Sequence, residues 1–235
     1  MADILLGGKI YSGIDRVQMD TADGRTVEFA DRNAVEEEAS AAGRAERLVS
    51  IDSLYYFFGT GVRRNFYAYL MGADLSHITN TQYMFVSCNW LTEFDFPETL
   101  HSRTPHYMFQ DCVNLTRVSG IGEHVSGSVL SGIFAGCTSL ENAGTISFNN
   151  VSYTSRAFLN CYSLKEIRIA GEIAVSLSFS ESGLLSDASV QSIIDHLKDL
   201  TGAATQTLTF HAEVGAKLTE EQKAAMTAKN WTLVY

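Results

Sequence analysis

Apolar residues recur at regular intervals along the middle of this chain. The frame Phe-x-x-Cys-x-x-Leu occurs four times, beginning at Phe85, Phe109, Phe134 and Phe158. A period in the twenties indicates a solenoid, in which each repeat is one supersecondary unit that buries its apolar face against its neighbours. We therefore expect the frame residues to form the repeat core: Phe85, Cys88, Leu91, Phe109, Cys112, Leu115, Phe134, Cys137, Leu140, Phe158, Cys161 and Leu164.

A strand-like stretch follows each frame. Phe94 and Phe96, for example, alternate with polar neighbours, which is the period of a half-buried strand. The apolar residue that precedes each frame Phe predicts a short helical turn that carries the Phe inward. In the third copy Ala143-Gly144 stands where a large apolar residue is expected, so the register of that copy is left open.

All four cysteines lie in the repeated frame, and two interpretations compete. Zinc sites need closely spaced pairs such as Cys-x-x-Cys, whereas here even neighbouring cysteines, such as Cys88 and Cys112, are a whole repeat apart. Side chains stacked in a ladder point the same way, which is poor geometry for a disulfide. The spacing therefore favours cysteine as a small apolar core residue at a tight bend over a metal site or a disulfide.

Both ends of the repeat array are predicted to be atypical copies. In residues 51–80, Phe58 lies slightly more than one repeat before Phe85, and the aromatic cluster around it either seals the core or forms a ligand platform near Arg63 and Arg64. At the other end, residues 179–185 imitate the frame, with Ser182 in the cysteine place.

The C-terminal part of the chain predicts alternating helices and strands. Residues 186–202 show the apolar spacing of one helix face, with Ser186 as N-cap and Gly202 as C-terminal stop. A strand, a second helix with Thr219 and Gln222 at capping-box spacing, and a final strand follow. This order is expected to extend the parallel sheet and to cap the solenoid.

The first residues predict a separate small module. Stretches 16–21 and 25–30 alternate apolar and polar residues around Asp23-Gly24, a strong hairpin signal. An isolated hairpin is marginal in water, so this one is expected to dock on a partner. The predicted organisation is a β-hairpin docking module (1–32), a polar linker or short helix (33–50), and a solenoid (51–235) with an N-terminal cap (51–80), four repeats (81–170) and a C-terminal cap (171–235).

Composition narrows the class of function. The formal net charge is -10, which argues against nucleic acid as a partner, because binding to it relies on clustered Lys and Arg. No signal peptide and no run of apolar residues long enough to insert into a membrane are seen, so synthesis in a bacterial cytoplasm is expected. No phosphate loop, nucleophile elbow or His-Glu-x-x-His motif occurs, so we expect no enzyme, no cofactor and no metal. A metal site at His101 and His106 is the weaker alternative.

The repeat frames resemble the bacterial BspA-like leucine-rich repeats over about residues 75–170. The resemblance implies an α/β repeat fold: a leucine-rich-repeat solenoid with parallel strands, here with a helix-strand C-terminal cap and an N-terminal β-hairpin module. The two ends of the chain, at about 1–30 and 186–235, are similar to ends of repeat proteins encoded in tailed-phage and prophage structural regions of gut Firmicutes.

These resemblances imply a non-enzymatic virion protein that docks on other virion proteins through residues 1–32 and presents its repeats for host attachment. A host-surface glycan or protein is the expected ligand, and a homo-oligomer is expected, a trimer by analogy with phage fibres. The alternatives are a capsid or tail decoration or fibre subunit without a ligand, and a cell-surface adhesin. The candidate binding surface comprises Trp90, Gln110, Asp111, Arg117, Tyr162 and Arg168. For Trp90, packing against a neighbouring coil is an equally supported interpretation.

Overall fold

The computed structural model describes residues 58, 75, 76, 78 and 80–235, together with the backbone of four short strands near the N-terminus. The strands are β1 (Ile4–Leu6), β2 (Lys9–Tyr11), β3 (Val17–Asp20) and β4 (Thr26–Phe29). Strands β3 and β4 pair antiparallel at the position where the sequence predicts a hairpin. The linker 33–50 and the aromatic cluster around Phe58, except Phe58 itself, lie outside the described residues.

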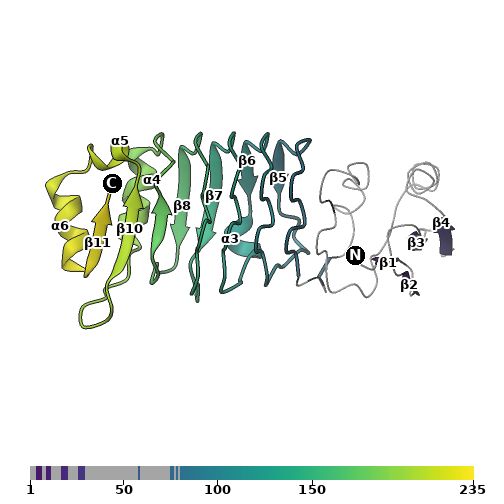
Figure 1. Cartoon of the computed structure of the whole chain (residues 1–235). Helices are drawn as coiled ribbons and strands as arrows, with labels where there is room; N and C mark the ends of the chain where they lie inside the picture. The colour runs from purple at the N-terminus through teal and green to yellow at the C-terminus, as the bar shows by residue number, and fades with distance from the viewer. Residues whose placement is uncertain are drawn as a thin grey trace.

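The repeats stack as successive coils (Figure 1). One side of the stack is a parallel sheet of β5 (Glu93–Asp95), β6 (Arg117–Ser119), β7 (Asn142–Ser147) and β8 (Glu166–Ala170), in that order. The sheet forms because each coil presents the same alternating stretch one period later. Its inward positions are buried, Phe94 and Ile167 among them, as the sequence predicts.

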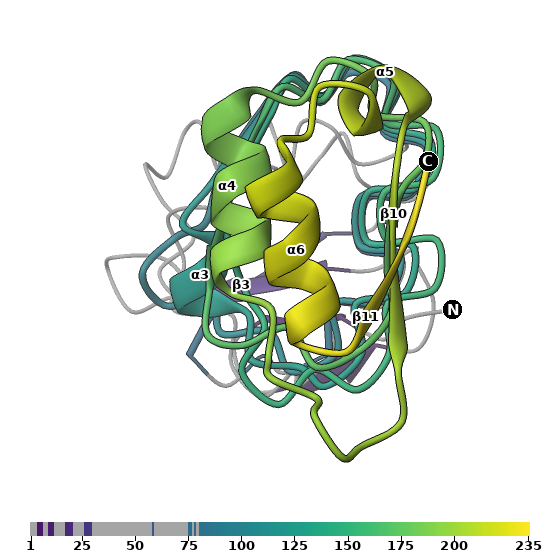
Figure 2. The same cartoon turned by 90° about the vertical axis from the view of Figure 1, so that its left-hand side faces the viewer.

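Helix α4 (Asp187–Asp195) covers the edge of β8 that pairs with no other strand. Ser189 Oγ accepts the N–H of Ile167 at 3.0 Å, and Ser192 Oγ accepts that of Ile169 at 3.1 Å. The helix thus takes the place of a further strand and protects an edge that would otherwise pair with another chain. Figure 2 shows α4 and α6 side by side at the C-terminal end of the stack.

The predicted N-cap of α4 is confirmed, because Ser186 Oγ accepts the N–H of Ser189. The predicted stop at Gly202 is wrong, since the helix ends at Asp195. The apolar spacing continues past this point for another reason. Leu197 pairs with Ile173 in a parallel β-bridge, and its side chain is buried from an extended chain.

The remaining strands form a second parallel sheet, in the order β9 (Leu177–Phe179), β10 (Gln206–Phe210) and β11 (Trp231–Val234). Between the last two lie α5 (Ala212–Gly215) and α6 (Glu220–Ala228), and the predicted capping box of Thr219 and Gln222 is present. The prediction that these strands extend the repeat sheet is wrong, because none of them pairs with β8.

A continuous column of phenylalanine rings runs through the core and shows where this second sheet belongs in the coil. Neighbouring ring centroids are 4.8 to 6.2 Å apart along Phe58, Phe85, Phe109, Phe134, Phe158, Phe179 and Phe210. Phe58 and Phe179 therefore act as frame residues, as predicted. Strands β9 and β10 occupy the coil position that the Phe-x-x-Cys segments occupy in the earlier copies.

The Phe-x-x-Cys segments are not helical turns, which corrects the sequence-based expectation. Residues two before and two after the frame Phe have positive φ, as at Tyr107 (φ 55°) and Asp111 (φ 58°) around Phe109. The segments therefore alternate between right- and left-handed backbone. We call the stacked segments 81–88, 105–112, 130–137 and 154–161 the turn ladder.

Because right- and left-handed residues alternate, every second N–H group of a turn-ladder segment points to the same side. In the first copy, Phe85 N–H donates to Met108 O at 2.8 Å and Ser87 N–H to Gln110 O at 2.8 Å. The second copy repeats this toward the third, and the third toward the fourth. All these bonds run from one coil to the next, so the ladder has an N–H end and a carbonyl end.

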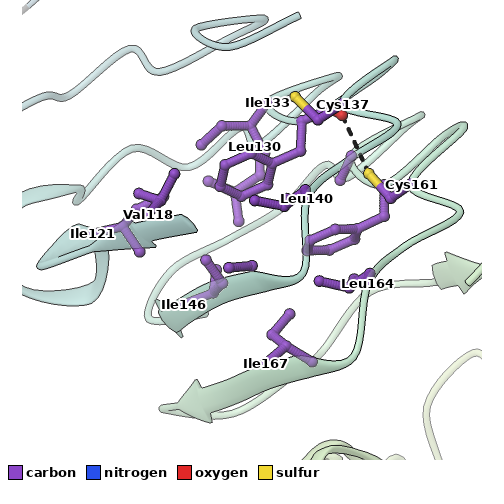
Figure 3. Packing of buried hydrophobic residues seen from close by; sticks show 14 of the residues in the cluster. Val118, Ile121, Leu130, Ile133, Cys137, Leu140, Ile146, Cys161, Leu164 and Ile167 are labelled. Carbon is purple, nitrogen blue, oxygen red and sulfur yellow. Dashed lines mark hydrogen bonds between the residues drawn. The ribbon is translucent and has the colours of Figure 1, made fainter. Parts of the chain in front are cut away.

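The four frame cysteines are buried and free, and each thiol donates to the carbonyl of the frame Phe in the preceding coil. The Sγ–O distances are 2.9 Å from Cys88 to Phe58, 2.9 Å from Cys112 to Phe85, 3.0 Å from Cys137 to Phe109 and 3.2 Å from Cys161 to Phe134. Figure 3 draws the last of these. Burial raises the pKa of the Cys112, Cys137 and Cys161 thiols, so they keep the proton that they donate.

The irregular third copy is accommodated by a bulge. The pairing of β7 with β8 shifts register between Asn142 and Thr145, and Gly144 has a φ of 70°. A Cβ there would lie 2.7 Å from the Val118 carbonyl oxygen, so the close approach requires glycine. The short helix α3 (Ile121–His124) buries Ile121 beside this strand.

We predict that Cys112→Ala lowers the free energy of unfolding by about 1–3 kcal/mol, because it removes a buried hydrogen bond and leaves a small cavity. Cys112→Ser keeps a donor near the Phe85 carbonyl and is expected to cost less than the alanine variant. Urea unfolding monitored by circular dichroism measures both, with Ser126→Ala at an exposed position as control. A serine variant less stable than the alanine variant would contradict a donating role for the thiol.

Candidate functional site

The six residues predicted as a binding surface lie in three different places. Arg117 and Arg168 are on the repeat sheet, Gln110 and Asp111 are in the turn ladder, and Trp90 and Tyr162 follow the frame cysteines. Trp90 is half-buried, packs against the core, and meets the Phe58 ring edge-on at 6.0 Å. This contact favours the packing interpretation for Trp90. Tyr162 is 52% exposed, and its hydroxyl donates to Asn160 Oδ1 at 2.8 Å.

Arg117, on β6, is held by two acidic residues on the preceding strand, β5. Its guanidinium donates to Glu93 Oε2 at 2.9 Å and to Asp95 Oδ1 at 2.8 Å. Hydrogen bonds from Arg117 and from the Ser119 hydroxyl lower the pKa of Asp95. Because its charge is already matched within the sheet, Arg117 serves the register of β5 and β6 more directly than it serves a ligand.

The weaker alternative drawn from the sequence is a metal site at His101 and His106. His101 instead lies beside His124, with ring centroids 5.1 Å apart, and His124 stacks on Phe96 at 6.0 Å. The His101 and His124 rings are tilted by 35° to each other, whereas the His124 ring lies nearly parallel to that of Phe96. Within residues 80–235 and the other described positions, no group of three or more His, Cys, Asp or Glu side chains is placed to hold a metal ion.

A hollow of about 610 Å³ lies on the surface at residues 152–156, 175–178, 206, 207 and 209. We call it the junction hollow, because it lies where the turn ladder ends and the second sheet begins. Serine and threonine side chains provide most of its lining, together with Tyr153, Arg156 and Gln206. Its volume is that of ordinary small-ligand sites, which span roughly 300–1,000 Å³.

Several lining groups are fixed by hydrogen bonds across the junction. The Thr154 hydroxyl donates to the Ser176 carbonyl. Gln206 Oε1 accepts the N–H and the hydroxyl of Ser176, each at 2.8 Å, and Ser176 Oγ accepts the N–H of Thr207 at 3.0 Å. Tyr153 and Arg156 remain exposed at the rim. The hollow thus combines a fixed polar wall with an aromatic and a cationic side chain that are open to solvent.

This hollow was not predicted from the sequence, although two signals point to it. The stretches 152–156 (SYTSR) and 175–179 (VSLSF) are rich in hydroxyl groups, and the interval from Phe158 to Phe179 is shorter than the intervals between the four complete frames. A coil that is shorter than its predecessor cannot keep the same hydrogen-bond register along its whole length. A change of structure was therefore to be expected at this coil.

The chemical groups that line the hollow are those of a binding site for a polar ligand. Hydroxyl, amide and guanidinium groups recognise polar ligands, whereas catalysis needs a positioned acid, base or nucleophile with a partner. Among the described residues that line the hollow there is no His, Cys, Asp or Glu. No helix in the described part of the chain has the length and apolar character needed to cross a membrane.

We predict that the Asp95 carboxyl titrates below its usual pKa in the folded protein and returns toward it in Arg117→Gln. A carboxyl with a lowered folded pKa adds stability at pH values above its unfolded pKa, near 3.9, and that stability is lost as the pH falls below it. Carbon-detected NMR titration of Asp95 in both variants measures this. Equal pKa values would show that the ion pair does not persist in solution.

Comparison with family models places a BspA type Leucine rich repeat region, in six copies, at residues 73–185. These limits include the four complete frames and reach past Ser182 into the predicted C-terminal cap. Searches of curated proteins and of solved structures find no match. Proteins with this repeat are typically non-catalytic. Residues 73–185 are therefore a BspA-type leucine-rich repeat region.

Proposed function

We propose that this chain is a non-enzymatic binding protein that displays its repeat stack at a surface and takes its ligand at the junction hollow. The observation that carries the proposal is the hollow itself: a volume of about 610 Å³ with fixed hydroxyl and amide groups, and with Tyr153 and Arg156 at its rim. Aromatic and arginine side chains are the residue types most enriched where binding energy concentrates.

We further propose that the surface is that of a tailed-phage virion and that the ligand is a host envelope component. The support is the resemblance of the two ends of the chain, at about 1–30 and 186–235, to parts of phage structural proteins. In this arrangement residues 1–32 dock on other virion proteins, and the stack points away from the particle. The proposed assembly is a homo-oligomer, because paired strands at the N-terminus need a partner surface.

Two other roles make different predictions for the same chain. A decoration or fibre subunit sits on the particle in many copies and has no affinity for host envelopes. A cell-surface adhesin is found on the bacterial wall and not on particles. The hollow favours a ligand-binding role over a purely structural one, because packing alone requires no fixed polar wall.

We predict that Ser178→Trp, which fills the junction hollow, weakens binding of the full chain to host envelopes at least tenfold. Thr92→Trp, at an exposed position beside β5, is the matched control and should leave binding unchanged. Sedimentation of labelled protein with purified envelopes from candidate host bacteria measures the affinity, and melting curves check that both variants fold. Unchanged binding by Ser178→Trp would remove the hollow from the proposal. No binding by the parent chain, with the chain located on particles by immunogold labelling, would favour the decoration role.

A further inference from the structure

The junction hollow lies where a row of backbone hydrogen bonds ends. In the third copy of the turn ladder, four N–H groups donate to the next coil. Leu130 donates to Tyr153 O at 2.8 Å, Gly132 to Ser155 O at 2.9 Å, Phe134 to Ala157 O at 3.0 Å, and Gly136 to Leu159 O at 2.8 Å. The corresponding donors of the fourth copy are Thr154, Arg156, Phe158 and Asn160.

The fourth copy keeps the conformation that sets this direction. Arg156 and Asn160 both have a φ of 59°, in the same places as Gly132 and Gly136 of the third copy. The N–H groups of the fourth copy therefore point toward the following coil. That coil forms strand β9, and it does not offer carbonyls in the matching register.

Three of the four N–H groups have no acceptor among the described residues, namely those of Thr154, Arg156 and Phe158. Thr154 reaches the Ser176 carbonyl with its hydroxyl and not with its N–H. Both Thr154 and Arg156 line the junction hollow. Unpaired backbone donors at the wall of a polar hollow indicate a place for a ligand that accepts hydrogen bonds.

The fourth N–H group shows which kind of acceptor the row takes. Asn160 N–H donates to a carboxylate oxygen of Glu181, a half-buried side chain of the next coil. Successive N–H groups in alternating right- and left-handed backbone form a concave site that favours anions. Within this chain, a carboxylate already occupies one position of the row.

Arg156 adds a positive charge at the same wall. Its side chain is exposed and has no ion-pair partner among the described residues. Hydrogen bonds from arginine to a carboxylate are about twice as strong as neutral ones. This wall of the hollow therefore favours an anion, although the formal net charge of the whole chain is -10.

The rest of the lining suits a sugar. The hydroxyl groups of Ser155, Ser178 and Thr209 both donate and accept, as sugar hydroxyls do. Tyr153, 55% exposed, offers a ring face for the apolar side of a pyranose. We propose that the junction hollow binds a carboxylate-bearing saccharide, with the carboxylate on the N–H groups of Thr154 and Arg156 and on the Arg156 guanidinium. This inference rests on the proposed binding function and names its ligand class.

The test uses the full chain and two acidic probes, trigalacturonate and methyl β-D-glucuronide, each beside its neutral methyl ester. Nitrogen-15 NMR titration follows the amide signals one by one. We expect the amide signals of Thr154 and Arg156 to shift with an acid and not with its ester. Arg156→Gln should raise the dissociation constant at least tenfold, whereas Arg103→Gln, an exposed arginine outside the hollow, should leave it unchanged.

Envelope sedimentation in parallel separates this inference from the proposed function. If the chain binds envelopes but neither acid shifts the two amides, the carboxylate inference is overturned and the binding function stands. Equal binding of acid and ester overturns the carboxylate while keeping a saccharide ligand. If neither envelopes nor probes bind, both proposals fail.

Discussion

Hydrogen bonding from each coil to the next is the constraint on which the rest of this structure depends. A solenoid has no partner for its backbone except its own neighbouring coils, and buried N–H and C=O groups are costly when unpaired. On one side the coils satisfy this with parallel strands β5 to β8. On the other side they use the turn ladder, in which the backbone bonds between coils run in the same direction. The frame cysteines add one more bond per coil, from a thiol to the preceding frame Phe.

The two sides of the stack end differently, and this difference locates the proposed site. On the sheet side, Ser189 and Ser192 of α4 accept the last N–H groups of β8, so the edge is closed by side chains. On the ladder side, the chain changes to true strands at β9, and only Asn160 finds an acceptor among the described residues, in Glu181. The Phe column passes through the change without interruption, because ring stacking needs only an aromatic residue at the same place in each coil. The core is therefore continuous where the backbone register is broken, and two of the residues whose N–H groups remain unpaired, Thr154 and Arg156, line the junction hollow.

The sequence allowed prediction of whatever depends on periodicity. The frame residues, the buried strand positions, the roles of Phe58 and Phe179, the N-cap Ser186 and the Thr219–Gln222 capping box all follow from spacing and residue type. Backbone handedness was not predictable, because Tyr83, Tyr107 and Arg156 adopt positive φ although L-residues other than Asn and Asp rarely do so. The end of α4 at Asp195 was missed because Leu197 is buried by a β-bridge and gives the same apolar signal as a helix face. The candidate surface of six residues was predicted from their places between the core positions of the repeats, whereas ligand sites depend on which segments meet. The junction hollow is formed by residues as far apart as Ser152 and Thr209.

The most direct test of this account is amide hydrogen exchange in the free protein, read residue by residue by NMR. It compares Leu130 and Gly132, which donate to the next coil, with Thr154 and Arg156, which hold the same places one coil later. The account predicts that Thr154 and Arg156 exchange at least a hundred times faster than their counterparts, since their N–H groups lack an acceptor and border the junction hollow. Equal protection at all four positions would contradict it, because the row of donors would then be closed within the protein and no site would remain for a ligand carboxylate.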